Sequence, residues 1–197
     1  DRLDWLDRLD RLLDLVDVAR IDHFKGFDEF WAIPADADSP AAGAWRDAPG
    51  HDFFETVRSQ VGELPFLVED LGFLDQGLVD LRERFDFPSM RVPHYADWCR
   101  EGDMYQPMHY PEASVGYTST HDTDTWVGYF ESLPKRQRDC FRFNVGADGD
   151  RAPEWEIIDE VWASEAVLAM TTVPDLLGHG SESRFNGPGT LDGNWGW

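Results

Sequence analysis

The stretch Val18-Ala19-Arg20-Ile21-Asp22-His23 passes from a short apolar run to an acid and a histidine. Its β-branched residues favour a strand, so the polar pair falls at the strand's C-terminal end. Two later stretches repeat the pattern. Phe66-Leu67-Val68 runs into Glu69-Asp70, and residues 114–117 lead to Thr120-His121-Asp122. We therefore predict three strands that each end in acidic residues.

Helix-forming segments separate these strands. Apolar residues recur at helical spacing from Leu3 to Val16, which predicts an amphipathic helix before the first strand. Further helices are expected over residues 51–61, 74–85, 125–130, 136–143 and 154–170, further strands over 89–92 and 171–173, and a Gly/Pro/Ala-rich loop over 34–50. About five strands then alternate with helices, which is typical of βα units around a parallel sheet.

The placement of the acids narrows the fold class. In a (β/α)8 barrel the chemistry lies at the C-terminal ends of the strands, and an open doubly wound sheet would place it similarly. No glycine-rich phosphate loop follows any of the expected strands, which argues against a nucleotide-binding sheet. The sequence also shows neither a signal peptide nor a run of eighteen apolar residues, so we expect a cytoplasmic protein.

The charge of the chain limits its partners. The net charge is −22, from 39 acids and 17 bases, and such a field repels nucleic acid and anionic lipid. Lys25 and Lys135 are the two lysines, and this acidic, lysine-poor composition leads us to expect a halophilic origin. Cys99 and Cys140 do not predict a disulfide framework or a metal site by their spacing.

Asp22 and Glu69 suit different chemical roles. Arg20 lies two residues from Asp22 and shares its face of the strand, where it would keep the carboxylate ionised and oriented as a nucleophile requires. The alternative is a structural Arg–Asp pair. Glu69 ends an apolar strand, where desolvation raises a carboxyl pKa and suits a general acid. The alternative is a helix N-cap cluster, for which Asp70 is a candidate.

Asp122 extends the pair to three acids. Next to His121 it is suited to binding sugar hydroxyls. A metal site is the alternative, but His23 is the one other histidine beside a matching strand end, so we expect no metal. Retaining glycosidases and transglycosidases use two carboxyl groups about 5–5.5 Å apart, and a third carboxylate can bind the distorted sugar ring.

The motifs that carry these acids resemble those of the amylomaltases, or 4-α-glucanotransferases. Arg20-Ile21-Asp22-His23-Phe24-Lys25-Gly26-Phe27 resembles the strand-four motif of that family, and Val68-Glu69-Asp70-Leu71-Gly72 resembles its strand-five motif. The resemblance continues over residues 30–34, 43–45, 49–50, 117–125, 175–178, 181–184, 186–190 and 193–195. It extends over essentially the whole chain, and its motifs are specific in combination.

This resemblance implies a (β/α)8 barrel of the α-amylase clan, with residues 1–197 supplying about strands 4 to 8 and the N-terminal strands missing. It implies that Asp22 is the nucleophile, Glu69 the general acid/base and Asp122 the stabiliser of the distorted ring. The substrate-binding residues implied with them are Arg20, His23, His121, Trp45 and Asn186. Because amylomaltases are much longer, we expect a fragment of a longer product; a decayed or split paralogue is the alternative.

The implied reaction cleaves an α-1,4 bond of a maltooligosaccharide, forms a covalent glucosyl-enzyme and transfers it to the 4-hydroxyl of another glucan. It needs no cofactor. An α-glucan hydrolase on the same scaffold and a non-catalytic glucan-binding remnant are the alternatives. Lys25 replaces the usual arginine of the family, Thr123 an asparagine, Pro174 a glutamine and Met108-His109 a His-Asn pair. Of these, the departures other than Lys25 concern substrate affinity more than chemistry.

Overall fold

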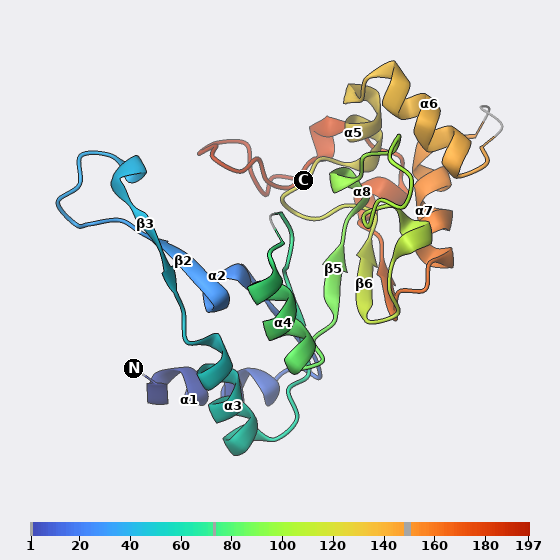
Figure 1. Cartoon of the computed structure of the whole chain (residues 1–197). Helices are drawn as coiled ribbons and strands as arrows, with labels where there is room; N and C mark the ends of the chain where they lie inside the picture. Colours follow the sequence, from blue (N-terminus) through green and yellow to red (C-terminus); the bar gives the residue numbers. More distant parts are fainter. Residues whose placement is uncertain (1, 73, 148–150) are drawn as a thin grey trace. The chain divides into compact units, whose positions relative to one another are not determined.

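A computed structural model describes residues 2–72, 74–147 and 151–197 of the chain (Figure 1). They form two compact units, Asp1–Met90 and Arg91–Trp197, which are described in turn. The elements that begin in the first unit are α1 (Arg2–Leu13), β1 (Ala19–Ile21), α2 (Lys25–Asp28), β2 (Glu29–Ala32), the 3-10 turn η1 (Pro40–Ala42), β3 (Ala44–Asp47), α3 (Gly50–Val61), β4 (Phe66–Val68), α4 (Gln76–Arg84) and β5 (Ser89–Arg91).

The first unit is built around short parallel strands. β1 pairs with β4 so that Ile21 lies opposite Val68, and Val68 also lies opposite Ser89 of β5. The core beside these strands is largely aromatic. Phe24 and Phe54 are fully buried, with ring centroids 5.7 Å apart, and Phe87 lies 5.2 Å from Phe54. Part of the aromatic content of the chain is therefore core.

The structure corrects the loop expected over residues 34–50. β2 and β3 pair antiparallel, with Trp31 opposite Trp45, and Figure 1 shows the hairpin ending in the loop that holds η1. The Trp31 ring donates from Nε1 to the carbonyl of Pro40 at 2.9 Å. A Cβ on Gly43 would lie 2.3 Å from that nitrogen, so the hairpin requires glycine there. Its Gly and Pro content, which suggested a loop, serves the turn region instead.

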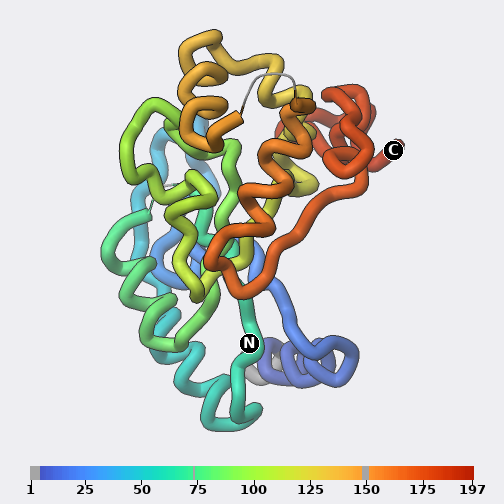
Figure 2. The backbone as a smooth tube through the Cα atoms, turned by 90° about the vertical axis from the view of Figure 1, so that its right-hand side faces the viewer, coloured from blue at the N-terminus to red at the C-terminus, as the bar shows by residue number. Residues whose placement is uncertain are grey.

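The second unit contains the rest of the chain. Its elements are η2 (Pro93–Tyr95), η3 (Pro107–His109), β6 (Ser114–Tyr117), α5 (Trp126–Ser132), α6 (Lys135–Asn144), α7 (Pro153–Ala163), β7 (Leu168–Met170), α8 (Val173–Leu176) and η4 (Ser181–Ser183). β6 and β7 pair in parallel, with Gly116 opposite Ala169. Figure 2 shows the chain turning after α7 and running back beside it through β7.

The long helix expected over 154–170 is wrong. α7 ends at Ala163, and Leu168–Met170 forms the strand that pairs with β6. The strand expected over 171–173 is therefore displaced toward the N-terminus, and Val173 begins α8. The helical pattern of this region is a property of the local sequence. The strand instead depends on pairing with a partner strand about fifty residues earlier in the chain, and local propensity carries no information about that partner.

The alternation of strands and helices is confirmed. Within the described residues the parallel strands are β1, β4, β5, β6 and β7, which matches the expected number. The helices expected over 51–61 and 136–143 are confirmed as α3 and α6, with ends shifted by one residue. In the part of the chain that the structure describes, no helix is long and apolar enough to cross a bilayer.

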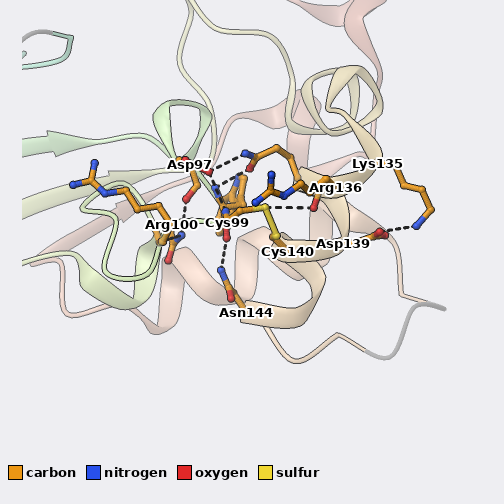
Figure 3. The surroundings of a disulfide bond; sticks show 11 residues. Asp97, Cys99, Arg100, Lys135, Arg136, Asp139, Cys140 and Asn144 are labelled. Atoms are coloured by element: carbon orange, nitrogen blue, oxygen red, sulfur yellow. Dashed lines mark hydrogen bonds and ion pairs between the residues drawn. A yellow bond between two sulfur atoms is a disulfide. The ribbon is translucent and has the colours of Figure 1, made fainter.

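Cys99 and Cys140 form a disulfide between the loop after η2 and helix α6 (Figure 3). Asn144 of α6 donates to the carbonyl of Trp98 at 2.7 Å, and Gln137 accepts from the Trp98 N–H at 2.9 Å. The sequence did not predict a disulfide between these cysteines, and the structure corrects that expectation. Their 41-residue separation carried no signal, because the tertiary fold brings their Cα atoms to 5.2 Å.

We predict that losing this disulfide destabilises the second unit. Closing a loop of 41 residues restricts the unfolded chain by about 4 kcal/mol in the chain-entropy model. The double variant Cys99→Ser/Cys140→Ser should therefore unfold at lower guanidinium concentration than the oxidised protein. Its midpoint should not respond to a dithiol reductant, whereas the parent's midpoint should fall. Equal midpoints for the oxidised parent and the variant would contradict the bridge.

Candidate functional site

Asp22 is an exposed carboxylate held from one side by an arginine. It follows β1 directly, and its Oδ1 lies 2.7 Å from Nη1 of Arg20. The Asp22 side chain is 74% exposed and that of Arg20 28%. The Arg20 Nε also donates to the sulfur of Met90 at 3.2 Å, which fixes the guanidinium against β5. The anchored guanidinium of Arg20 therefore orients the exposed carboxylate of Asp22.

Glu69 is fastened to the segment that follows Asp22. Its Oε2 accepts from the N–H of His23 at 2.9 Å, and its Oε1 accepts from the N–H of Leu71 at 3.0 Å. In the backbone, Glu69 N donates to Ile21 O at 2.9 Å and Phe24 N donates to Glu69 O at 3.0 Å. These bonds continue the ladder of β1 and β4 beyond the strands.

His23 has an unusual backbone that explains its contact with Glu69. Its φ of 47° lies in the left-handed region, which non-glycine residues rarely adopt. Such conformations cluster at functional sites when the surroundings hold them. The neighbouring Gly26 leaves room for the His23 ring, because a Cβ there would lie 3.2 Å from the ring Cδ2. In the structure His23 holds Glu69 through its main-chain N–H, whereas the sequence pointed to its imidazole side chain.

The N-cap reading of Asp70 is wrong. Asp70 is buried, its Oδ2 accepts from Arg82 at 2.8 Å and its Oδ1 accepts from the N–H of Met90 at 2.9 Å. Helix α4 is capped by Asp75, whose carboxylate accepts from the N–H of Leu78 at 3.0 Å. Asp70 therefore ties β4 to β5 and α4, and Glu69 is left free of any capping role.

Lys25 forms ion pairs with a group of three acids in the first unit. Its ammonium lies 2.8 Å from Asp28 and 2.9 Å from Glu29, and it also bonds Asp75. Burial lowers the pKa of Lys25, but the hydrogen bonds to Asp28, Asp75 and Glu29 together raise it well above its ordinary value. The ammonium thus stays charged and joins the segment after Asp22 to the N-terminus of α4.

In the second unit the structure brings together His121, Asp122 and Asn186. Asp122 Oδ1 accepts from the Asn186 amide at 2.5 Å, and Oδ2 lies 3.1 Å from Nε2 of His121. Asp122 is 49% exposed and His121 42%. Arg184 also donates from Nη2 to the main-chain oxygen of Asp122 at 2.8 Å. The carboxylate is thereby oriented while one face stays open to solvent.

Two neighbours of this group were not singled out from the sequence. The first is Arg184, and the second is Trp195, whose ring stacks on His121 with centroids 5.6 Å apart. Trp195 has a left-handed φ of 58° and donates from its N–H to Phe185 O at 2.6 Å. Both lie in the C-terminal motifs of the chain, but motif membership did not reveal that this segment folds back onto His121.

Trp45 lies outside these hydrogen-bonded groups. It is 55% exposed on β3, and its ring meets that of Trp31 edge to face at 5.4 Å. The pair forms an exposed aromatic surface on the hairpin. The eight sequence-predicted residues thus divide between the units. The first contains the Arg20–Asp22 pair, the His23–Glu69 pair and Trp45, and the second contains His121, Asp122 and Asn186.

His94 is a half-buried histidine of η2 that contacts the segment presenting Asp122. Its ring lies 4.4 Å from that of Tyr129, and its Nε2 lies 3.0 Å from the carbonyl oxygen of Asp124. Burial lowers the pKa of His94 to about 4, against the weaker opposing effect of the Asp175 carboxylate. The ring is therefore neutral near pH 7 and donates to Asp124 from Nε2.

Comparisons with known proteins find the same family over almost the whole chain. Residues 3–197 match the family model described as 4-alpha-glucanotransferase. The 4-alpha-glucanotransferase of Synechocystis sp. is 37% identical over 195 residues, which cover 98% of this chain and 39% of the relative. That of Thermus thermophilus is 36% identical over 201 residues, covering 98% and 40%.

Solved structures give the same result. The amylomaltase from Streptococcus agalactiae in complex with acarbose superposes with a TM-score of 0.93 at 30% identity, over 98% of this chain and 39% of that one. The amylomaltase from Corynebacterium glutamicum gives a TM-score of 0.73 at 16% identity, which shows a shared fold. The chain spans about two fifths of the length of these first relatives.

We predict that His94 makes the fold sensitive to acid. Its pKa is about 4 in the folded state and about 6.5 when unfolded, so the unfolded chain binds more protons between these values. Stability is full above pH 6.5 and falls as the pH drops. Between pH 7 and pH 5 the loss is about 2 kcal/mol. Urea unfolding of His94→Gln should lack this part of the decline.

The exposed His109 supplies the matched control for this measurement. His109→Gln should retain the parent's dependence of unfolding free energy on pH, because it changes an exposed side chain and leaves His94 in place. An identical decline in the parent and in His94→Gln would show that another group causes it.

Proposed function

The chain belongs to the 4-alpha-glucanotransferase family, and from this premise we propose that it carries the catalytic carboxylates of an enzyme that transfers α-1,4-glucan segments between maltooligosaccharides. Asp22 is the nucleophile, Glu69 the general acid/base and Asp122 the stabiliser of the distorted glucosyl ring. The observation that carries the proposal is the register of β1 and β4, because Asp22 and Glu69 directly follow the paired residues Ile21 and Val68.

The spacing of adjacent strands supports the pairing of Asp22 with Glu69. Neighbouring strands lie about 4.8 Å apart, and the two carboxylates follow neighbouring strands at the same level. Retaining enzymes hold their two carboxyl groups about 5–5.5 Å apart, whereas inverting enzymes need a wider gap for a water molecule. Adjacent strand ends therefore favour the retaining mechanism.

The surroundings of each acid suit its role. Asp22 is exposed, which leaves it open to the anomeric carbon, and Arg20 at 2.7 Å orients its carboxylate. Glu69 receives two backbone hydrogen bonds, from the N–H groups of His23 and Leu71, which hold its carboxyl group in place. These surroundings suit Asp22 to act as the nucleophile, and they suit Glu69 to exchange a proton with the substrate.

The reaction follows from these roles. Glu69 gives its proton to the glycosidic oxygen while an Asp22 oxygen attacks the anomeric carbon, so the C–O bond to the leaving glucan breaks as the glucosyl–Asp22 ester forms. The 4-hydroxyl of an acceptor glucan then attacks the same carbon, Glu69 takes up its proton, and the ester bond breaks. Asp122, oriented by Asn186 and His121, binds hydroxyls of the ring as it flattens.

Of the remaining predicted residues, Trp45 and His121 are proposed to contact substrate directly, and Arg20, His23 and Asn186 to hold the catalytic carboxylates. The exposed Trp45 ring offers an apolar face for a glucose unit, and His121, stacked on Trp195, offers donors to hydroxyls. Asn186 and Arg20 act mainly through the carboxylates that they orient. His23 holds Glu69 through its main-chain N–H. Acarbose, which the Streptococcus agalactiae amylomaltase binds, is a suitable probe of these contacts.

We further propose that residues 1–197 form about strands 4 to 8 of a (β/α)8 barrel, with the other strands supplied by polypeptide outside this range. The TM-score of 0.93 to an amylomaltase of which the chain covers 39% supports this assignment. Activity is therefore to be measured on the full-length protein. If a protein limited to these 197 residues folds and transfers glucan alone, the remaining strands are not required.

Incubation with maltotriose separates transfer from hydrolysis. A transferase should yield glucose together with maltodextrins longer than maltotriose, whereas glucose and maltose without longer products would identify a hydrolase. Binding of maltotriose without cleavage would identify a non-catalytic remnant.

We predict that Asp22→Asn abolishes both products while the fold is retained. The amide is a poor nucleophile but has the same size, and Asp22 is exposed, so stability should change little. Asp17→Asn, which alters an exposed acid before β1, should leave the products unchanged. An active Asp22→Asn enzyme would remove Asp22 from its role as nucleophile.

We also propose a cytoplasmic location. In that reducing compartment the Cys99–Cys140 disulfide would be reduced to two thiols. Alkylation of the protein at the moment of lysis, followed by mass spectrometry, distinguishes the two forms. A quantitatively intact disulfide would argue for an oxidising compartment instead.

A further inference from the structure

Asp175 is a fully buried carboxylate at the start of α8. Its Oδ2 accepts from the hydroxyls of Thr118 and Ser119, each at 2.6 Å, and its Oδ1 accepts from the N–H of Trp126 at 2.7 Å. No lysine or arginine forms an ion pair with it in the part of the chain that the structure describes. Burying an unpaired charge is costly, so three short, charge-assisted bonds must offset the loss of hydration.

These three bonds enclose one particular segment. Thr118 and Ser119 lie just before residues 120–125, and Trp126 lies just after them at the first turn of α5. Asp175 therefore holds both ends of the segment that presents His121 and Asp122. Ser119 is fixed a second time, because its hydroxyl lies 2.8 Å from that of Thr172.

Within the segment the main chain is held partly by its own short side chains and partly by Arg184, which donates to Asp122 O. Thr120 N donates to the hydroxyl of Thr123 at 2.8 Å, and the Asp122 N–H bonds the Thr120 hydroxyl at 3.3 Å. Asp122 is half exposed, so little packing fixes its position. Asn186 and His121 hold its carboxylate directly, and the anchoring of the two ends of the segment sets where that carboxylate meets them.

We propose that Asp175 is a positioning residue for the glucan transfer reaction and acts through Asp122. The inference rests on the proposed function, in which Asp122 stabilises the distorted ring. A carboxylate suits this position because it accepts from three donors and presents no proton of its own. It joins the C-terminal part of the chain to the catalytic segment, 49 residues from Trp126 and 57 from Thr118.

The proposal predicts a specific kinetic pattern. An interaction that strengthens in the transition state affects kcat, whereas uniform substrate binding affects KM. A shift of Asp122 by about 1 Å lowers the rate on the order of 10²-fold. Asp175→Asn keeps the shape but turns an NH2 group toward former donors, so we expect kcat for maltotriose to fall by roughly 10- to 100-fold, with KM changed by less than about threefold.

A double-variant cycle in the full-length protein tests whether Asp175 acts through Asp122. If it does, Asp122→Asn/Asp175→Asn should lose little more activity than Asp122→Asn alone. The control is Asp103→Asn, a buried aspartate of the same unit that accepts from the Tyr105 N–H away from this segment. It should keep the parent's kcat. Rates are compared at equal folded fraction, measured by circular dichroism.

Each outcome bears on the proposal. An unchanged kcat in Asp175→Asn, an effect confined to KM, or additive losses in the double variant would overturn it. If Asp175→Asn does not fold, Ser119→Ala removes one of the three donors and should lower kcat several-fold at constant KM; no change would overturn the proposal. A parent without transferase activity would instead contradict the proposed function, so the two failures are distinguishable.

Discussion

The parallel pairing of β1 with β4 is the constraint on which the proposed chemistry depends. It places Ile21 opposite Val68, so that the next residue on each strand is an acid. The bond from Glu69 N to Ile21 O and that from Phe24 N to Glu69 O carry the same register past the strand ends. A shift by one residue would turn one of the acids to the other face of the sheet. The buried phenylalanines beside these strands maintain that register.

In the second unit, Asp122 is an exposed residue within the largely half-buried segment that follows β6. The segment is held from the C-terminal part of the chain. Asn186 orients the Asp122 carboxylate, Arg184 bonds its main chain and Asp175 anchors both ends of the segment. The C-terminal motifs therefore serve the site by contact, although none of their residues is itself one of the three proposed catalytic acids.

Much of this arrangement was predictable from the sequence, because the decisive signals are local. The run Phe66-Leu67-Val68 followed by Glu69 predicts a buried strand with an acid at its end, and this strand is confirmed as β4. The family resemblance added the roles of the acids, which stay a proposal.

Features that depend on distant partners could not be predicted. Leu168–Met170 has a helical pattern before it, yet forms a strand because β6 lies beside it. The disulfide of Cys99 depends on α6 approaching the loop after η2. His23 acts through a left-handed backbone that its residue type gave no reason to expect. In each case the tertiary neighbour determines the outcome.

The most direct test of the assignment is to trap the covalent intermediate. In the full-length protein, Glu69→Gln slows proton transfer and should allow a glucosyl ester to accumulate from an activated fluorinated α-glucosyl donor. Proteolysis and mass spectrometry should then find one added glucosyl group on the peptide that contains Asp22. A glucosyl group on a different carboxylate, or turnover of the donor with inversion at the anomeric carbon, would contradict the assignment.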